Sequence, residues 1–470
     1  MSYEEKYKHI ILPLYGKVRD NIIDEEFTRR MHIPHDYSIP NNKRVNFSHI
    51  DTFSVDPPNC KDADDAFSIY YEYEKLFLAI HIADPTEYIP VNSKLFNDII
   101  KRVSTKYPSN HNPIHLMPDN ILEISSLMEN SQGSEKKAIS VVTEINKDTY
   151  LPCGHVNILF TTLRVKRENS YNYKEASQNI ESIDEFDLGI KISQKLRERR
   201  SKKTQGTKLS DIKYSYPVFD NSNHTITLYE DSDEEKKMKI MIEEFAIFAN
   251  SFVGAYLKSH LNTGIFRACD AKHWLKTIDI GISGKDMLQD IIQNGIKGEY
   301  VSSIQSHDLV GMPEYCHFTS PIRRLSDCIC HYLLKYIFYK PQYIHYKQPF
   351  GQVELDVLSS KCLSENKRDK KIQFSDIKFR LIQYMDSLLQ NSEEITLQYY
   401  ITSYSGLFLN LIICNINHHN IHLSYTIRTR SYTKPFFAKE RKQIKITRVN
   451  CFMKYDENTI PELEEEILGE

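Results

Sequence analysis

The stretch Asp56-Pro-Pro-Asn-Cys-Lys-Asp62-Ala-Asp64-Asp65 decides the fold, because residues 67–73 directly after it carry large apolar or aromatic side chains at every second position, as a strand does. Four carboxylates this close would repel one another if all were ionised without a counter-charge. Hard divalent cations supply that charge, and Mg²⁺ suits carboxylate oxygens while it retains waters and substrate phosphates. The segment therefore predicts a metal site at the entry to a sheet.

Two other interpretations of this acidic stretch compete with the metal site. A Ca²⁺-binding EF-hand loop counted from Asp62 needs glycine and glutamate where the sequence has Phe67 and Tyr73, so the spacing excludes it. A solvated acidic turn is compatible with the segment taken alone, and that alternative stays open.

Strand and helix patterns continue along the chain from this point. Glu74-Lys75 predicts a tight turn, and LFLAIHIA (residues 76–83) predicts a second, more buried strand. Asn92 or Ser93 then caps a short predicted helix. The strongest helix signal begins at Ser232, where a capping box precedes a broad apolar stripe at helical spacing.

A second motif, His317-Phe-Thr-Ser320-Pro321-Ile-Arg323-Arg324, places a polar cap and a proline at the start of another predicted helix. Arg323 and Arg324 would stand in its first turn, where unpaired N–H groups favour anions and guanidinium groups add bidentate phosphate contacts. The alternative is two surface arginines paired with local acids such as Asp327. Cations at a helix N-terminus are unfavourable unless an anion is present, so the motif favours phosphate binding.

A third stretch interleaves the cations Arg164, Lys166 and Arg167 with Tyr171 and Tyr173. Such a pattern suits single-stranded nucleic acid, because cations contact phosphates and rings stack on bases. With 30 tyrosines in the chain, ordinary core or surface tyrosines are the alternative.

The composition of the 470 residues is that of an ordinary globular protein, with 40% hydrophobic and 26% charged residues. The net charge of −3 excludes a polycation, so any nucleic-acid surface has to be a local patch. Nine cysteines without a CxxC pair suggest neither a disulfide framework nor a zinc cage, and they favour a reducing, cytoplasmic compartment. No secretory signal or membrane helix is predicted.

Shifts in composition divide the chain into four predicted parts. Residues 1–45 form a lead-in segment, and residues 46–345 form the domain that holds the acidic and arginine motifs. Residues 346–460 combine a helical connector with β-like runs, and residues 461–470 form an acidic tail.

Six segments, taken in order, resemble the catalytic domain of the ribonuclease II/R (RNB) family over about residues 45–340. They are VDPPNCKDADDAFS (55–68), LAIHIADPTEYI (78–89), STKY…LMPDNILEISSL (104–127), SYNYKEA (170–176), MIEEFAIFAN (241–250) and CHFTSPIRRLSDCICHYL (316–333). The resemblance implies an α+β catalytic domain, with a mixed or antiparallel sheet, packed helices and a central RNA channel. The β-rich segment after it takes the place of a divergent OB-type RNA-binding domain.

The same resemblance implies an exoribonuclease that degrades single-stranded RNA processively and hydrolytically, 3′→5′, to nucleoside 5′-monophosphates. Mg²⁺ is the expected cofactor, with Mn²⁺ as a potential substitute, and the implied metal ligands are Asp56, Asp62, Asp64 and Asp65. Asp62, Asp64 and Arg323 are the implied catalytic residues, of which Arg323 clamps the scissile phosphate. The implied RNA contacts are Tyr107, Tyr173, Arg324 and the pair Glu243-Glu244 near the 3′ ribose. The helical wheel favours Glu243, which lies away from the apolar stripe, but does not decide between the two.

Family members typically carry two cold-shock domains before the catalytic domain, and the first 45 residues cannot hold one. We therefore expect weaker retention of long RNA and a helper RNA-binding protein, while the oligomeric state is not predicted. A catalytically inert RNA-binding protein on the same fold is the main alternative. A two-metal phosphodiesterase that prefers DNA is a further one, because the sequence does not show recognition of the 2′-hydroxyl.

Overall fold

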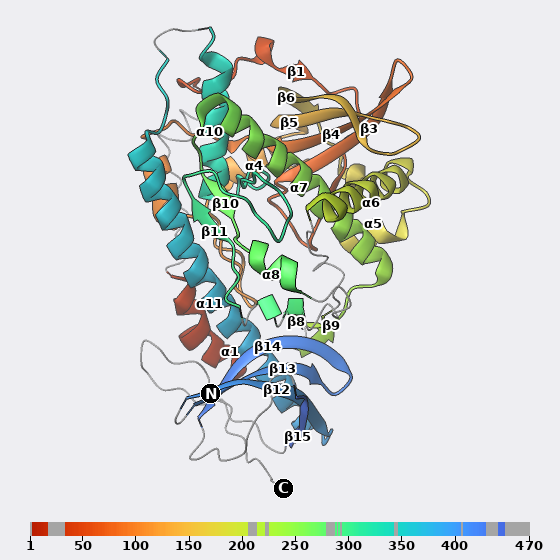
Figure 1. Ribbon diagram of the computed structural model, residues 1–470, viewed down its shortest axis with the longest axis vertical. Coiled ribbons are helices and arrows are strands. Elements are labelled where there is room, and N and C mark those ends of the chain that lie inside the picture. The colour runs from red at the N-terminus through yellow and green to blue at the C-terminus, as the bar shows by residue number, and fades with distance from the viewer. Residues whose placement is uncertain are drawn as a thin grey trace.

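The computed structural model describes residues 2–16, 33–204, 214–220, 225–278, 287–288, 290–291, 294–342, 346–405, 408–428 and 440–446. Sheets and helices are mixed along the chain, which confirms the predicted α+β class. In Figure 1 the larger sheet lies at the upper right with helices against it, and the smaller C-terminal sheet lies at the bottom beside one end of α11.

The main sheet has the strand order β1-β6-β5-β4-β3. Antiparallel pairs join β3 (Asp65–Glu72), β4 (Lys75–Ala83), β5 (Glu135–Ile145) and β6 (Pro152–Arg164), and β1 (Val45–Asn46) adds to β6 in parallel. The predicted hairpin is confirmed, but the predicted turn at Glu74-Lys75 is wrong by one residue. Glu72 pairs with Lys75, so the turn is Tyr73-Glu74, whose φ angles of 45° and 61° are those that a two-residue hairpin turn requires.

Helices α6 (Asp184–Thr204) and α7 (Asp233–Leu261) lie over one face of this sheet (Figure 1). Ser232 caps α7 and completes a capping box with Glu235, as predicted. By length and composition α7 could cross a membrane, yet half of its most apolar window is buried inside the protein. The helix contributes Met241, Phe245 and other residues to the main hydrophobic core, which explains its apolar composition.

Helix α10 (Leu325–Tyr339) begins later than the sequence predicts. The expected start at Pro321 is wrong, because residues 321–323 form a turn and Arg324 is an extended N-cap with a φ of −137°. The Ile322 N–H donates a hydrogen bond of 2.7 Å to Oδ1 of Asp64, a partner far away in sequence. The helix starts late because the backbone on either side of Arg324 pairs with residues 103–105: the Thr105 N–H donates to the Arg323 carbonyl at 3.0 Å, and the Leu325 N–H donates to the Val103 carbonyl at 2.8 Å. The two arginines therefore precede the helix.

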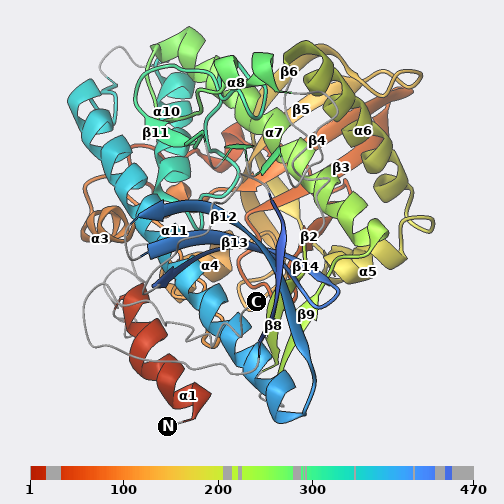
Figure 2. The same cartoon turned by 60° about the horizontal axis from the view of Figure 1, so that its bottom comes forward.

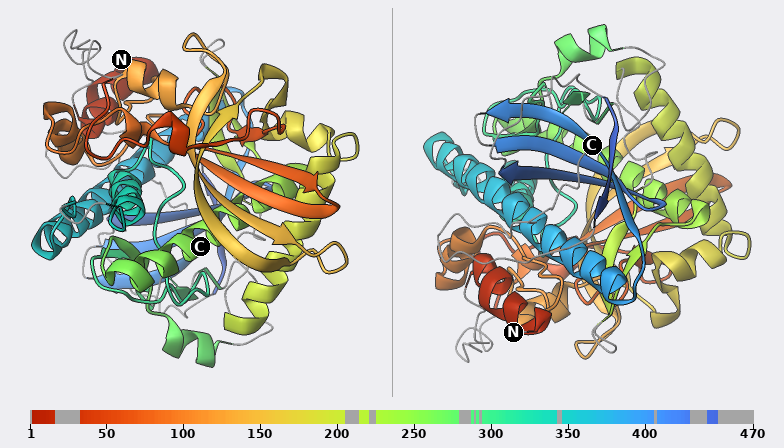
Figure 3. Two further views of the ribbon diagram at one scale, coloured as in Figure 1. Left: turned by 90° about the horizontal axis from the view of Figure 1, so that it is seen from above. Right: turned by 90° about the horizontal axis from the view of Figure 1, so that it is seen from below.

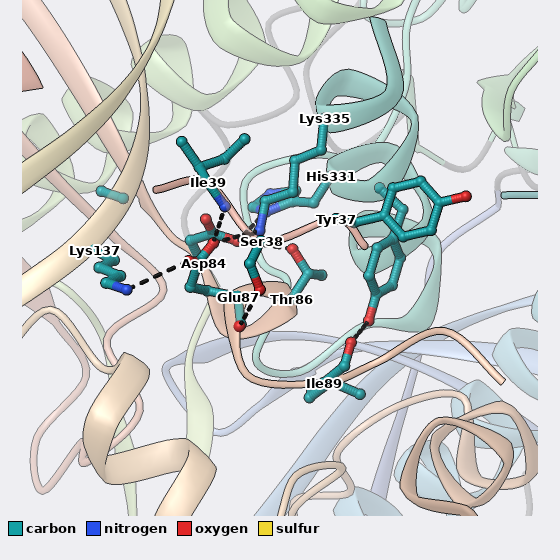
Figure 4. A network of polar contacts seen from close by, with 12 residues as sticks. Tyr37, Ser38, Ile39, Asp84, Thr86, Glu87, Ile89, Lys137, His331 and Lys335 are labelled. Atoms are coloured by element: carbon teal, nitrogen blue, oxygen red, sulfur yellow. Dashed lines mark hydrogen bonds and ion pairs between the residues drawn. The ribbon is translucent and has the colours of Figure 1, made fainter. Parts of the chain in front are cut away.

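A buried ionic network holds α10 against the end of β4 and the segment before β1 (Figure 4). Arg44 Nη2 lies 2.9 Å from Asp84 Oδ2 and 2.8 Å from Glu87 Oε2. Lys335 Nζ lies 2.9 Å from Asp84 Oδ1 and 3.1 Å from Glu87 Oε2, and each of these four side chains is at most 4% exposed. Two cations thus neutralise two carboxylates in the interior, the arrangement that a buried charge requires.

The long helix α11 (Gln352–Gln390) leads into a four-stranded antiparallel sheet of order β14-β13-β12-β15. Its strands are β12 (Ile395–Ser405), β13 (Phe408–Ile416), β14 (His419–Arg428) and β15 (Lys442–Ile446). Leu381, Ile382 and Met385 of α11 share a hydrophobic cluster with this sheet, which Figure 2 shows in front of the helix. The OB-type assignment of this part stays a prediction, and the predicted acidic tail lies outside the described residues.

The lead-in segment folds into α1 (Tyr3–Lys6), η1 (Tyr7–Ile11) and η2 (Leu12–Tyr15). Tyr7, Ile11 and Tyr15 share a hydrophobic cluster with Phe379 of α11, and Figure 3 (right) shows α1 alongside this helix. The remaining elements are η3 (Asn41–Lys43), β2 (Ser54–Asp56), η4 (Pro85–Glu87), α3 (Lys94–Arg102), α4 (Asp119–Ser125), η5 (Arg167–Asn169), β7 (Ser170–Asn172), α5 (Tyr173–Gln178), β8 (Tyr216–Asp220), β9 (Thr225–Tyr229), β10 (Phe266–Ala268), α8 (Lys272–Thr277) and β11 (Glu299–Val301).

Candidate active site

Regular structure on both sides fixes the four aspartates. Asp56 ends β2 and pairs with Asn172 of β7, which brings Tyr173, the first residue of α5, beside the acidic stretch. Asp65 opens β3 at the other end. Between them, the Ala63 N–H donates to Ser126 Oγ at 3.1 Å, and the Ala83 N–H donates to the Asp64 carbonyl at 2.8 Å. The backbone of the acidic segment is therefore held from several directions.

Asp64 and Arg323 join the two sequence motifs in one place. Arg323 Nε lies 3.0 Å from Asp64 Oδ2, and the other carboxylate oxygen accepts the Ile322 N–H. The Asp64 side chain is 3% exposed, whereas that of Arg323 is 45% exposed. Asp64 is thus buried beneath a guanidinium group that still reaches solvent, so the arginine can also meet a ligand.

Burial gives three of the carboxyls unusual protonation behaviour. It raises the pKa of Asp56 to about 7, with a further contribution from the negative charge of Asp65. Burial also raises the pKa of Asp64 and of Asp65, and Arg323 only partly offsets it. Oδ2 of Asp56 is buried and, among the described residues, has no hydrogen-bond partner. These carboxylates are short of positive charge.

Asp62 differs because polar groups surround it. Its carboxylate lies 3.4 Å from the Tyr107 hydroxyl, 3.5 Å from the Cys60 thiol and 3.6 Å from Nδ1 of His115. Burial acts to raise the pKa of Asp62, but the hydrogen bond and charge of His115 outweigh it and lower the pKa. Asp62 is therefore the member of the cluster that most readily carries negative charge.

The donor chemistry of the cluster fits a hard divalent cation, because it offers carboxylate oxygens, one of them buried without a partner, and too few cations to balance them. The side chains do not converge, however. Within the described ranges, no group of three or more histidine, cysteine, aspartate or glutamate side chains is arranged to hold a metal ion. Asp64 is turned toward Arg323, and Asp62 toward His115 and Tyr107. Residues of the right type are assembled, with the guanidinium of Arg323 beside Asp64 and the imidazole of His115 beside Asp62.

A cavity of about 2400 Å³ opens onto this cluster. Most of the predicted site residues line it: Asp56, Asp62, Asp64, Asp65, Tyr107, Tyr173, Glu243, Arg323 and Arg324. Arg324 also donates hydrogen bonds to Asp327, at 2.9 and 2.8 Å. For this arginine the alternative interpretation, pairing with a local acid, is therefore correct.

The structure separates the two glutamates that the sequence could not. Glu243 lines the cavity, while Glu244 is 1% exposed and does not. Arg200 of α6 binds both oxygens of Glu244, at 2.5 and 3.2 Å. Arg200, whose exposed fraction is 5%, therefore belongs to a buried ion pair and is not a solvated surface cation.

The basic, aromatic stretch contributes only Tyr173 to the cavity. Lys166 pairs with Asp51, and the ring of Tyr171 packs edge-on against Phe186. Among the cavity residues that the sequence analysis passed over are His115 and Lys239. Lys239 lies four residues before Glu243 on α7, and its ammonium is 5.4 Å from the centre of the Tyr173 ring. The helical spacing of Lys239 and Glu243 was the signal that could have found it.

Comparison with known proteins gives consistent matches. The RNB domain family model matches residues 44–340. Ribonuclease R of Helicobacter pylori is 25% identical over 383 residues, which cover 72% of this chain and 57% of that protein. The chain thus spans little more than half the length of this curated relative.

Two solved structures show the same fold at low identity. RNase R of Mycoplasma genitalium, in complex with ribose-methylated single-stranded RNA, has a TM-score of 0.74 at 16% identity, covering 95% of this chain and 76% of that one. Yeast Ssd1, described as a pseudonuclease, has a TM-score of 0.61 at 15% identity, covering 82% and 50% respectively. The fold therefore occurs both in a ribonuclease and in a pseudonuclease.

Proposed function

The chain belongs to the RNB domain family, and on that premise we propose that it is a 3′→5′ exoribonuclease acting on single-stranded RNA. The proposal includes hydrolysis to nucleoside 5′-monophosphates, dependence on Mg²⁺ with Mn²⁺ as a substitute, and processive action. One observation carries it: a buried acidic cluster and a partly exposed arginine meet at the wall of a large cavity, with Asp64 and Arg323 in contact.

Arg323 would bind the scissile phosphate. Its guanidinium is planar, always charged and carries five donors, so it can hold Asp64 through Nε while it presents other donors to a phosphate. Charge that develops on the phosphate during cleavage strengthens this contact, and so the arginine favours the transition state over the bound RNA.

The aromatic residues and Glu243 would place the 3′ end. Tyr107 and Tyr173 both line the cavity, and each ring can stack on a base. Tyr107 lies beside Asp62, and Tyr173 follows Asn172, the residue that pairs with Asp56. Glu243 lines the same cavity and can accept hydrogen bonds from the ribose hydroxyls at the 3′ end.

Asp56, Asp62, Asp64 and Asp65 would hold the divalent cation. When bound, it supplies counter-charge to the carboxylates and Lewis acidity to the phosphate oxygens. The raised pKa values of Asp56, Asp64 and Asp65 describe carboxyls that lack a cation, which is the state such a ligand would relieve.

A catalytically inert RNA-binding protein is the second candidate. It is favoured by the occurrence of this fold in a pseudonuclease and by the carboxylates not converging. Against it stands the complete set of four aspartates with Arg323 at one cavity.

Product analysis separates the candidates. Purified protein is incubated with single-stranded RNA, or with DNA of the same sequence, in Mg²⁺, Mn²⁺ or EDTA. The proposed activity predicts metal-dependent release of nucleoside 5′-monophosphates from RNA, with little release from DNA. RNA that is bound but stays intact in both metals would instead support the inert protein, and equal cleavage of DNA would support the phosphodiesterase.

A further inference from the structure

The segment of residues 103–115, here the Tyr107 segment, touches both halves of the candidate active site. Its backbone is bonded to the arginine motif, since the Thr105 N–H donates to the Arg323 carbonyl at 3.0 Å. Its side chains reach the acidic cluster, where Tyr107 and His115 both lie next to Asp62. The segment therefore connects Asp62 to Arg323 through direct contacts.

The Tyr107 segment is closed into a loop by its own hydrogen bonds. The Lys106 N–H donates to the Ile114 carbonyl at 3.0 Å, and the Ile114 N–H returns a bond of 2.9 Å. The Leu116 N–H donates to Oγ1 of Thr105 at 3.0 Å. These bonds tie the two ends of the segment together.

Two carboxylates of α11, which do not line the cavity, accept hydrogen bonds from this loop. Asp369 accepts hydrogen bonds from Ser104 Oγ at 2.7 Å and from Lys106 Nζ at 2.5 Å. Asp376 accepts the Ser109 N–H at 2.9 Å and the hydroxyl of the same serine. The two aspartates are seven residues apart, about two helical turns, so they project from one face of α11.

Two tyrosines of the lead-in segment bind Asp376, the second of these carboxylates. The hydroxyls of Tyr7 and Tyr15 each donate to Asp376 Oδ2 at 2.8 Å. Asp376 is 3% exposed, so this carboxylate is buried but well supplied with donors. Figure 3 (right) shows the N-terminal helix lying alongside α11, which brings both segments to the loop.

We propose that Asp369 and Asp376 are positioning residues: α11 and the lead-in segment act through them to hold the Tyr107 segment, and thereby keep Tyr107, Asp62 and Arg323 in register. This inference rests on the proposed function. It assigns to residues 2–16 and to α11 a part in the active site, although none of the described residues of either lines the cavity.

The two anchors have different expected effects on RNA degradation. Asp369 holds Ser104 and Lys106, beside the backbone bond to Arg323. Asp369→Asn should mainly lower kcat, by about ten- to a hundredfold, the cost of a small misplacement of reacting groups. Asp376 holds Ser109, on the side of Tyr107 away from Arg323, so Asp376→Asn should mainly raise KM, by about tenfold.

The test combines kinetics with hydrogen–deuterium exchange on the full chain. Asp369→Asn, Asp376→Asn and the milder Tyr7→Phe are compared with the control Asp386→Asn, since Asp386 lies on α11 but bonds to Gln390 of the same helix. Asp369→Asn and Asp376→Asn should both show faster exchange in residues 104–114. Asp369→Asn should also lower kcat, and Asp376→Asn should raise KM. The control should change neither the exchange nor the kinetic constants. Tyr7→Phe, which removes one hydroxyl, should follow Asp376→Asn with a smaller effect.

Two results would overturn the inference, and they are distinguishable. If Asp369→Asn and Asp376→Asn both turn over RNA as fast as the wild-type protein, with unchanged exchange of residues 104–114, the positioning role is rejected and the proposed function is not. Absence of wild-type turnover rejects the proposed function and, with it, the catalytic role of the anchors.

Discussion

Nε of Arg323 lies 3.0 Å from Oδ2 of Asp64, so the two most distinctive motifs of the sequence meet in a single ion pair. Asp64 is buried, whereas Arg323 is partly exposed and lines the cavity, and its Nη2 also donates to Ser320 Oγ at 3.0 Å. A phosphate bound there would be held by an arginine whose orientation is already fixed, and fixed donors lose little entropy on binding.

Arg323→Lys should lower the turnover of RNA nearly as much as Arg323→Ala, although lysine keeps the charge. The reason is geometric, because an ammonium group cannot hold Asp64 and bind a phosphate in two directions as a planar guanidinium can. We expect a loss in kcat of about a hundredfold or more for both variants, with a smaller change in the Kd for RNA. Steady-state kinetics and binding in EDTA measure the two quantities. Full activity in Arg323→Lys would show that only the charge matters.

Glu243→Gln and Glu244→Gln should behave oppositely, although the residues are neighbours. Glu243 lines the cavity, so its change should raise KM and weaken the preference for RNA over DNA, with stability altered by no more than about 0.5 kcal/mol. Glu244 neutralises the buried Arg200, so its change should cost about 3 kcal/mol of folding free energy. Urea denaturation and RNA/DNA kinetics test the pair, and the reverse pattern would place Glu244 at the 3′ ribose.

Lys335→Met should destabilise the fold by about 3–5 kcal/mol, because it leaves Asp84 and Glu87 with one buried cation in place of two. Adding Asp84→Asn should restore part of the loss, since the network is then neutral again. Lys137→Met is the control: Lys137 contacts Glu87 at 3.3 Å from the partly exposed rim and should cost under about 1 kcal/mol. Equal losses for Lys335 and Lys137 in denaturant titrations would contradict this account.

His81 should make the fold sensitive to acid. Burial lowers the pKa of His81 to about 3 from the usual 6.5. Between these values the unfolded chain binds a proton that the folded protein does not, so stability falls as the pH falls through this window.

From pH 7 to pH 5, wild type should therefore lose about 2 kcal/mol more than His81→Gln, in which this titration is absent. The exposed His155 provides the matched control, His155→Gln, which should lose as much as wild type. Parallel stability curves for wild type and His81→Gln would show that His81 does not govern the acid response.

Local signals in the sequence predicted the elements that local chemistry determines. Ser232 and Glu235 form the expected capping box of α7, and Ser93 caps α3, because a cap bonds within its own first turn. The four aspartates, Tyr107, Tyr173 and Arg323 gather at one cavity, as the order of the motifs led us to expect.

The features that could not be predicted from the sequence depend on contacts between residues far apart in the chain. Arg200 comes from another helix to bind Glu244, and no helical wheel contains that contact. The start of α10 shifted because the backbone around Arg324 pairs with residues 103–105, more than 200 residues earlier in the chain. The role of Asp376 was invisible for the same reason, since its donors Tyr7 and Ser109 stand hundreds of residues away in the chain.

The most direct test of the central claim follows a 3′-labelled single-stranded RNA with wild type and Asp64→Asn in Mg²⁺. Asparagine keeps the shape of this side chain and an oxygen that can accept the Ile322 N–H, so the variant should still fold, which thermal unfolding verifies. The account predicts that wild type releases the label as a nucleoside 5′-monophosphate, whereas Asp64→Asn binds the RNA with similar affinity and turns it over orders of magnitude more slowly. Equal turnover by the two proteins, or intact RNA bound to wild type, would contradict it.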